Sequence, residues 1–284
     1  MYRISPFTPI FFTPSGDKYG PGSVTVQTFA ETDRILIEVI ATGEASAPPT
    51  LVTRELCSGF ESSYPWREWV MNDSTTLYFI ELQGMEDGRY VACIGDRESE
   101  PFIVTSDPTL IQDTVLFQYS NRNNRQRNDV VFWIDGMQHF FDFRVPGGFK
   151  DDNWTFGVNN EQFLTSDNDK IDLYSQESTV KALTIGNGDG CPVWFADLVN
   201  RLLCCNYVYV DKVRYARNES EVPEMNAEVE GLKSYIFTQG LTKVLNLDPV
   251  IEEKNMLIMR RVESEGEVQY REETVENNEF NLII

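Results

Sequence analysis

The chain has 284 residues, and its 45 acidic side chains outnumber its 24 lysines and arginines, which gives a formal net charge of −21. Such a surface repels phosphate groups, so nucleic acids and anionic membranes are not expected partners. The length predicts two domains, and 41% hydrophobic residues are enough for two cores. The sequence has no apolar run long enough to span a membrane, and its start does not resemble a signal peptide. We therefore expect a protein made in the cytoplasm.

Residues 1–22 contain four prolines and three glycines, which predict an irregular N-terminal arm. Within this arm, Ile10, Phe11 and Phe12 form an apolar cluster that loses free energy if it stays in water. The cluster is expected to pack either on the first domain or on a neighbouring chain. These three residues are therefore candidates for a subunit interface.

Residues 23–106 are predicted to form an immunoglobulin-like β-sandwich. Short β-rich runs alternate there with Gly and Asp turn signals, at 34–40, 76–82, 89–94 and 101–104. The segment 87–93 resembles a tyrosine corner, in which a Tyr at the start of a late strand, here Tyr90, bonds back to the preceding turn. The alternative is a β-hairpin that contains a Tyr by chance. Cys57 and Cys93 are too close in sequence for the inter-sheet disulfide of a true immunoglobulin domain.

A second β-rich domain is expected over 107–247, because the polar pair before Pro108 ends one segment and starts another. One helix is predicted at about 192–205, with Pro192 at its start and apolar residues at helical spacing. The helix is preceded by a strand at 114–119 and followed by strands at 207–210, 213–216 and 235–238. The fold class is therefore mainly β.

The strongest local pattern is Asp135-Gly136 between two β-rich runs. This dipeptide predicts a type I′ hairpin, because both turn residues need a positive φ. In the resulting register Trp133 pairs with Gln138, and Phe132 pairs with His139. Asp211-Lys212 is expected to form a second hairpin turn.

Arg122, Arg125 and Arg127 form the densest basic patch of the sequence. They are read either as a solvated loop or as a contact with an acidic surface of a like or different subunit. The tail 248–284 is acidic, in contrast to this patch. A projecting hairpin is expected in it around 264–267. Its apolar end, Leu282, Ile283 and Ile284, is expected to need a docking surface.

We expect no catalytic, cofactor or metal residues. His139, the single histidine, lies among aromatic residues on a predicted hairpin strand, which is typical of a structural role. Glycines at 186, 188 and 190 precede the helix without the Lys-Ser/Thr of a phosphate-binding loop. The segment 167–172 lacks the glycine and the final Glu of a calcium loop. The five cysteines fit no zinc spacing and are expected to be reduced and mostly buried.

Five stretches of the second domain look like stretches from uncharacterised proteins of crAss-like phages: 118–121, 132–136, 141–149, 190–195 and 207–210. Through these stretches the second domain resembles tail and ring-forming structural proteins of bacteriophages and prophages. A β-sandwich with one helix and a hairpin is also similar in outline to tail-tube and distal-tail subunits. There, the sheet of one subunit joins those of its neighbours to make a ring.

The resemblance implies a non-enzymatic virion structural protein, a tail, neck-ring or baseplate subunit. Its expected partners are copies of itself and other virion structural proteins, and its expected location is the virion, after synthesis in the host cytoplasm. The alternative is a carbohydrate-binding β-sandwich module for adhesion, in which exposed indole rings would stack on glycans. The indoles that could supply such a platform are Trp66, Trp69, Trp133 and Trp154. An aromatic row on an open face would favour this alternative, and burial of the rings would favour assembly.

Overall fold

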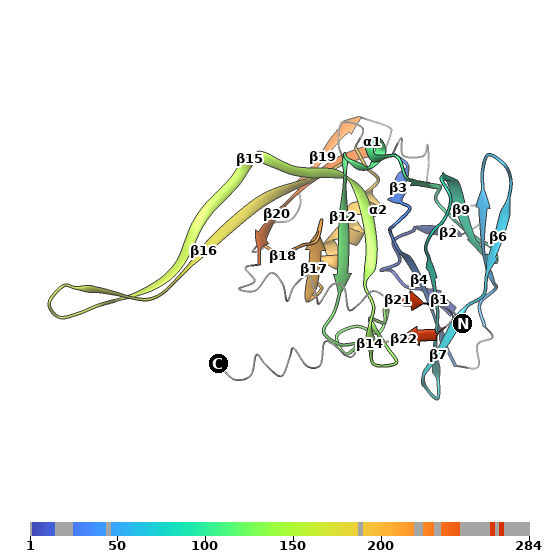
Figure 1. Ribbon diagram of the computed structural model, residues 1–284, viewed down its shortest axis with the longest axis horizontal. Helices are drawn as coiled ribbons and strands as arrows, with labels where there is room; N and C mark the ends of the chain where they lie inside the picture. The colour runs from blue at the N-terminus through green and yellow to red at the C-terminus, as the bar shows by residue number, and fades with distance from the viewer. Residues whose placement is uncertain are drawn as a thin grey trace.

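A computed structural model describes residues 2–14, 25–43, 47–186, 190–218, 224–229, 234–244, 262–264 and 267–269. The prediction of a mainly β fold is confirmed: strands dominate, and the described residues contain two helices. Figure 1 shows a body from which one long hairpin projects. The expected tail cluster Leu282, Ile283 and Ile284 lies outside the described residues.

The N-terminal half forms two sheets that share one core. Sheet A has the order β1-β4-β8-β7, and its strands are Tyr2–Ile4, Ile35–Thr42, Thr75–Leu82 and Arg67–Asn72. Sheet B has the order β2-β10-β9-β11-β3, and β5 pairs with β9 and with β6. Its strands are β2 (Phe12–Pro14), β3 (Gln27–Ala30), β5 (Leu51–Glu55), β6 (Glu61–Tyr64), β9 (Gly88–Ile94), β10 (Arg97–Ser99) and β11 (Phe102–Thr105).

The core between sheets A and B is built from alternate residues of their strands, as expected where each strand buries one face. Ile37 and Ile80 come from sheet A, and Ile94 and Phe102 come from sheet B. The Tyr90 hydroxyl donates a hydrogen bond to the Glu86 carbonyl at 2.9 Å, which is the bond predicted for a tyrosine corner.

Residues 2–14 differ from the irregular arm that was expected. β1 joins sheet A by pairing with β4, and β2 joins sheet B by pairing with β10. Each strand has only three residues, so the prolines between them, such as Pro6 and Pro9, interrupt no ladder. Ile10 is buried in the core between the sheets, which means that no neighbouring chain is needed to cover it.

The C-terminal half is built around a sheet that closes on itself. After the short helix α1 (Pro108–Ile111), the strands β12 (Thr114–Ser120), β15 (Phe141–Leu164), β16 (Lys170–Ile185), β20 (Ser234–Lys243), β18 (Val213–Arg217) and β17 (Tyr207–Val210) follow one another in space. β17 pairs again with β12, so these six strands form a complete circuit, which we call the closed sheet. β19 (Glu224–Val229) pairs with β20 beyond this circuit.

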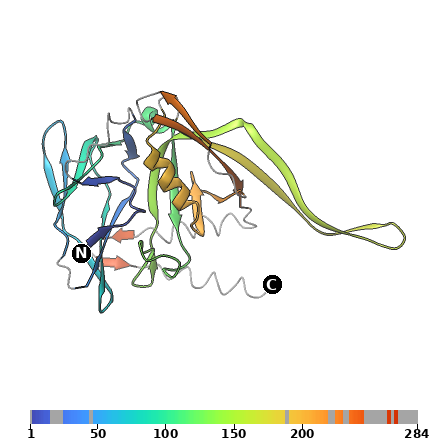
Figure 2. The ribbon, with the colours of Figure 1, turned by 180° about the vertical axis from the view of Figure 1, so that it is seen from behind.

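Helix α2 (Val193–Leu202) begins after Pro192, as predicted from the apolar spacing. It buries Phe195, Leu198, Val199 and Leu202 in the core of the C-terminal half. The Phe195 ring meets the Phe143 ring of β15 edge to face, with centroids 5.5 Å apart. Figure 2 shows the helix lying across the strands of this half, on the side turned away in Figure 1.

Both predicted hairpin turns are confirmed. Asp135 and Gly136 have φ values of 50° and 77°, and they join β13 (Trp133–Ile134) to β14 (Met137–Gln138) in the predicted register. Asp211 and Lys212 have φ values of 48° and 70° between β17 and β18. A further pair of strands, β21 (Val262–Ser264) and β22 (Glu267–Gln269), forms a hairpin where one was expected in the tail.

β4 is the strand that joins the two halves, because both of its faces are buried. Ile35, Ile37 and Val39 face the core between sheets A and B. The intervening Leu36 and Ile40 belong to the core of the C-terminal half, together with side chains of the closed sheet and α2. A strand that is covered on both sides needs apolar residues at successive positions. The run from Ile35 to Ala41 meets this need at every position except Glu38.

Glu38 is fully buried within this junction. One carboxyl oxygen accepts a hydrogen bond from the Val131 backbone N–H at 3.1 Å, and the other has no hydrogen-bond partner within the described residues. Burial raises the pKa of Glu38 to about 8, against the smaller opposing effect of the Val131 bond. Glu38 is therefore protonated at neutral pH.

A second polar contact fastens the two halves together. Arg144 of β15 holds Asp33, just before β4, with two hydrogen bonds of 2.6 and 2.9 Å from its guanidinium. Both side chains are buried, with 9% and 2% exposure. Removal of either side chain alone would leave the other charge buried and unpaired, so both are needed at this junction.

Candidate functional site: the projecting hairpin and the arginine surface

The most distinctive surface feature is the outer part of the β15–β16 hairpin, residues 154–181, which we call the projecting hairpin. β15 stops pairing with β12 after Pro146 and turns onto β16 at Gly147, whose φ of 148° and close approach to the Thr184 carbonyl leave no room for a side chain. The two strands then pair only with each other from Trp154 outwards, apart from the contact of Val180 and Lys181 with β20. Figure 1 shows this ribbon extending far from the body.

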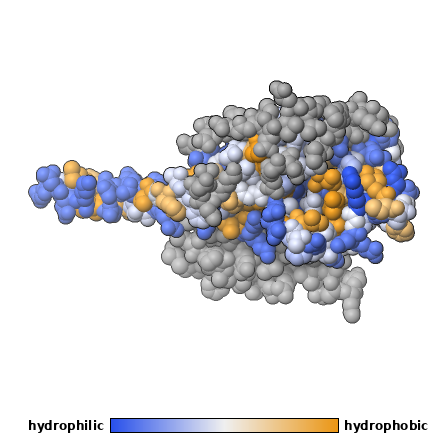
Figure 3. Space-filling model, turned by 90° about the horizontal axis from the view of Figure 1, so that it is seen from above, coloured by the Kyte–Doolittle hydropathy of each residue, from blue (hydrophilic) through white to orange (hydrophobic). Residues whose placement is uncertain are grey.

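Large apolar side chains are exposed along the projecting hairpin. Phe156 is 74% exposed and Phe163 is 57% exposed, and Val158, Leu164, Ile171, Leu173 and Tyr174 are also exposed. Figure 3 shows apolar and hydrophilic residues interspersed along the projection. A two-stranded ribbon with unpaired outer edges is only marginally stable in water, and exposed apolar groups on it favour contact with another surface.

The apolar residues follow the alternation of the strands. Trp154, Phe156 and Val158 occupy every second position of β15 and therefore lie on one face of the ribbon. Near the tip, Phe163 pairs with Ile171 on the opposite face, close to a register shift between Glu161 and Gln162. Each face of the ribbon thus carries exposed apolar side chains.

The second candidate surface contains the loop of the predicted arginines. Arg122 and Arg125 are exposed, whereas Arg127 forms a 2.6 Å ion pair with Asp129 and lies 4.7 Å from the centre of the Phe7 ring. Arg127 is therefore partly committed to its own chain. Two further arginines, which the sequence did not single out, join this group.

The additional arginines reach the same surface from distant segments. Arg3 of β1 donates a hydrogen bond to the Asn128 carbonyl at 3.1 Å. Arg214 of β18 donates to the Asn206 carbonyl at 3.1 Å, while the Asn206 side chain accepts from the Arg122 backbone N–H at 3.1 Å. We call these five residues the arginine surface. Within the described part of the chain, only Arg127 among them forms an ion pair.

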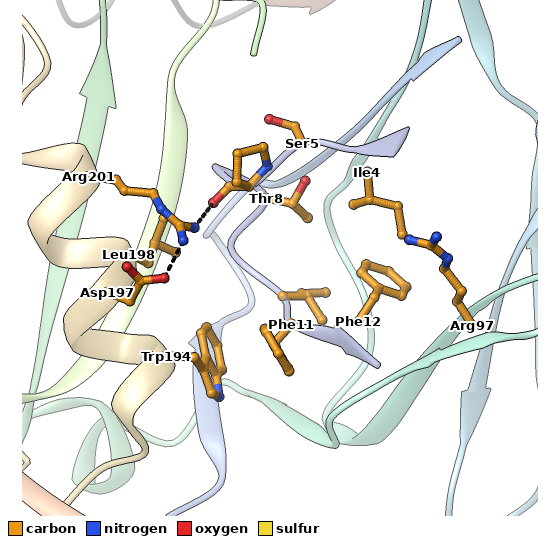
Figure 4. Close-up of a pocket in the computed structure, with 12 residues that line it drawn as sticks. Ile4, Ser5, Thr8, Phe11, Phe12, Arg97, Trp194, Asp197, Leu198 and Arg201 are labelled. Carbon is orange, nitrogen blue, oxygen red and sulfur yellow. Dashed lines mark hydrogen bonds and ion pairs between the residues drawn. The ribbon is translucent and has the colours of Figure 1, made fainter. Parts of the chain in front are cut away.

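A shallow cleft lies between the first strands and helix α2 (Figure 4). Phe11 stacks on Trp194 at its floor, with ring centroids 5.5 Å apart, and Arg201 donates to the Pro6 carbonyl at 3.1 Å. Phe12 and Arg97 line the side formed by sheet B. The cleft volume is about 210 Å³, which is below the roughly 300–1,000 Å³ of sites for drug-sized ligands. It could accept one or two side chains of a partner.

The indole rings proposed as a glycan platform do not form a row. Trp66 packs against the core between sheets A and B, and its ring N–H donates to the Pro49 carbonyl at 2.8 Å. Trp69 and Trp133 pack against the core of the C-terminal half. Trp154 lies on the projecting hairpin, beneath the Lys181 ammonium, which is 3.8 Å from the ring centroid. By the criterion of an aromatic row on an open face, this arrangement does not favour glycan binding.

The groups considered for chemistry are dispersed. The His139 ring meets Phe79 edge to face at 5.9 Å, and no group of three or more potential metal ligands occurs among the described residues. Cys57 and Cys204 are exposed, contrary to the expectation of mostly buried thiols. Burial raises the pKa of the Cys191 and Cys205 thiols to about 12, which keeps them protonated and unreactive at neutral pH.

The segment that resembles a calcium loop forms the tip of the projecting hairpin. The Thr165 N–H donates to the Asp169 carbonyl at 2.8 Å, and Asn168 adopts a φ of 63°. A turn explains this run of Asp and Asn, because both residues tolerate left-handed backbone conformations. None of the described helices is long and apolar enough to cross a membrane. No family model matches the sequence, and no curated protein matches it.

Proposed function

We propose that this chain is a non-enzymatic assembly subunit of a virion, which joins copies of itself through the projecting hairpin into a ring of a phage tail, neck or baseplate. The observation that carries the proposal is the exposure of eight large apolar side chains, Trp154 included, on a ribbon that projects from the body. The phage assignment rests on the sequence resemblance of the second domain, and other virion structural proteins are proposed as further partners.

The free energy available from the projecting hairpin matches the cost of association. Complete burial of a large apolar side chain contributes about 1.5–3 kcal/mol, so the eight partly exposed ones contribute on the order of 10 kcal/mol. Association costs roughly 4–15 kcal/mol in lost freedom of motion. The apolar residues can therefore drive assembly when the unpaired strand edges add hydrogen bonds to a neighbour.

The N-terminal half is proposed to be an immunoglobulin-like unit within this subunit. The Tyr90–Glu86 hydrogen bond and the core shared by sheets A and B support this classification. In the proposed subunit this unit is a rigid part of the body, because β4 contributes to both cores.

Self-association of the purified chain tests the proposal directly. Sedimentation velocity should show oligomers for the wild type, and a variant with Phe156→Ser, Val158→Ser and Phe163→Ser should sediment as a monomer with unchanged far-UV circular dichroism. The matched control, Thr155→Ser and Gln176→Ser, changes polar residues of the same ribbon and should still assemble. A wild type that remains monomeric at every salt concentration, or a triple variant that assembles normally, would refute the role of the hairpin.

The virion assignment needs a separate measurement. Purified phage particles should contain this chain in a fixed copy number by quantitative mass spectrometry, and a cryo-EM map should place it in a closed ring. Absence of the chain from the particles would exclude the virion assignment and leave only the assembly function.

A further inference from the structure

We infer that the projecting hairpin of one copy docks on the arginine surface of the next copy, so that the two features form the two sides of one repeated contact. This inference rests on the proposed function, and it identifies the acceptor of the hairpin.

The first argument is charge complementarity. Between residues 154 and 181 the hairpin has five carboxylates and two lysines, so its net charge is −3. The arginine surface gathers five of the 24 basic residues of a chain whose formal net charge is −21. Two copies of so acidic a chain repel one another in most orientations. They attract one another when the acidic hairpin of one copy faces the arginine surface of the other.

The second argument concerns the state of the arginines themselves. Arg3, Arg122, Arg125 and Arg214 form no ion pair within the described part of the chain, although carboxylates are abundant in the sequence. Arg3 and Arg214 each use one guanidinium nitrogen, which donates to the Asn128 and Asn206 carbonyls respectively. Arg122 bonds to the Asn206 side chain through its backbone N–H alone. The remaining guanidinium donors are available for bidentate contacts with carboxylates.

The third argument is geometric. The projecting hairpin extends away from the body in Figures 1 and 2, so it does not cover the arginine surface of its own chain. A contact between two different patches, one on each copy, is heterologous, and its repetition forms a ring when the rotation between successive copies closes on itself. Glu161 lies two residues before the exposed Phe163 on the same face of the ribbon, so apolar and charged contacts would occur together there. Asp172 pairs with Gln162 and adds a carboxylate on the other face of the tip half.

Charge reversal on each side tests the pairing. The variant Arg122→Glu/Arg125→Glu and the variant Glu161→Lys/Asp172→Lys should each weaken self-association by about 10- to 100-fold, measured by sedimentation velocity near 0.15 M ionic strength. The combined fourfold variant should recover most of the lost affinity, because the opposed charges are again complementary. The control Arg67→Glu/Arg89→Glu changes two exposed arginines of the N-terminal sheets and should retain wild-type affinity.

The outcomes separate this inference from the proposed function. If the wild type assembles and the apolar hairpin variant does not, but the charge-reversed pairs assemble normally or show no recovery when combined, the arginine surface is not the acceptor and only the inference fails. A wild type that never assembles overturns both. Weakening by Glu161→Lys/Asp172→Lys supports the pairing specifically, because these two changes reduce the net charge from −21 to about −17 and would strengthen self-association if only general repulsion between acidic chains mattered.

Discussion

Replacement of Glu38 by Gln should make the protein more stable at neutral and alkaline pH. Glu38 keeps its proton in the folded state up to a pKa of about 8, whereas the same carboxyl ionises near 4.5 when exposed. Unfolding therefore releases a proton between these two pH values, and the free energy of unfolding falls as the pH rises through this window. Above pH 8 the loss is complete, and below 4.5 it is absent.

The magnitude follows from the width of the window. Each pKa unit corresponds to about 1.4 kcal/mol, so a shift from 4.5 to about 8 gives on the order of 5 kcal/mol at high pH and about 3 kcal/mol at pH 7. Gln cannot ionise, and its amide oxygen can still accept the hydrogen bond from the Val131 N–H. The variant thus removes the titration and keeps the local packing.

Urea unfolding between pH 5 and 8 measures this effect. The free energy of unfolding of Glu38→Gln should exceed that of the wild type by an amount that grows by about 1.4 kcal/mol per pH unit. Taking the difference between the two proteins cancels the titration of the other carboxylates. Glu68→Gln, on the exposed face of β7, is the control and should run parallel to the wild type. Parallel curves for Glu38→Gln would show that Glu38 is ionised in the folded protein, which would refute the reasoning.

Two further changes test the turn and the junction. Gly136→Val should cost roughly 1–3 kcal/mol of unfolding free energy, because φ at this residue is 77° and an added Cβ meets no other atom, so the cost is purely that of the backbone; an unchanged melting temperature would contradict this. Asp33→Asn should cost about 3–5 kcal/mol by leaving the buried Arg144 guanidinium without its carboxylate. The double change Asp33→Leu/Arg144→Met should lower the free energy of unfolding by less than Asp33→Asn does, because it leaves no buried charge unpaired. A larger decrease for the double variant, measured by urea unfolding, would contradict this reasoning.

Local patterns predicted local structure well. The Asp-Gly turn, the helix after Pro192 and the strand from Ile35 each depend on residues within a few positions, and each lies where it was expected. The identification of Tyr90 as a hydrogen-bonding corner residue also needed only the turn that precedes it.

The features that were missed depend on contacts between distant segments. Residues 150–180 are rich in Asn, Asp, Gln and Ser, and their composition is typical of loops, yet they form the longest ribbon of the protein because each strand pairs with the other. The strands of residues 2–14 form only because β4 and β10 offer edges to them. The full arginine surface was likewise not visible in the sequence, since Arg3 and Arg214 come from segments far from the loop at 122–127.

The burial of both faces of β4 determines the order in which its two sides can be covered while the chain is being synthesised. Once residues up to 105 have emerged, sheet B can cover one face of sheet A. The other face, with Leu36, Ile40, Leu77 and Phe79, stays exposed until Phe132 and Phe141 have been synthesised. At about 5–20 residues per second, that delay is roughly 2–7 s. During this interval the nascent chain exposes an apolar sheet face that chaperones and other nascent chains can bind. The first half of the polypeptide therefore depends for its solubility on the timely arrival of the second.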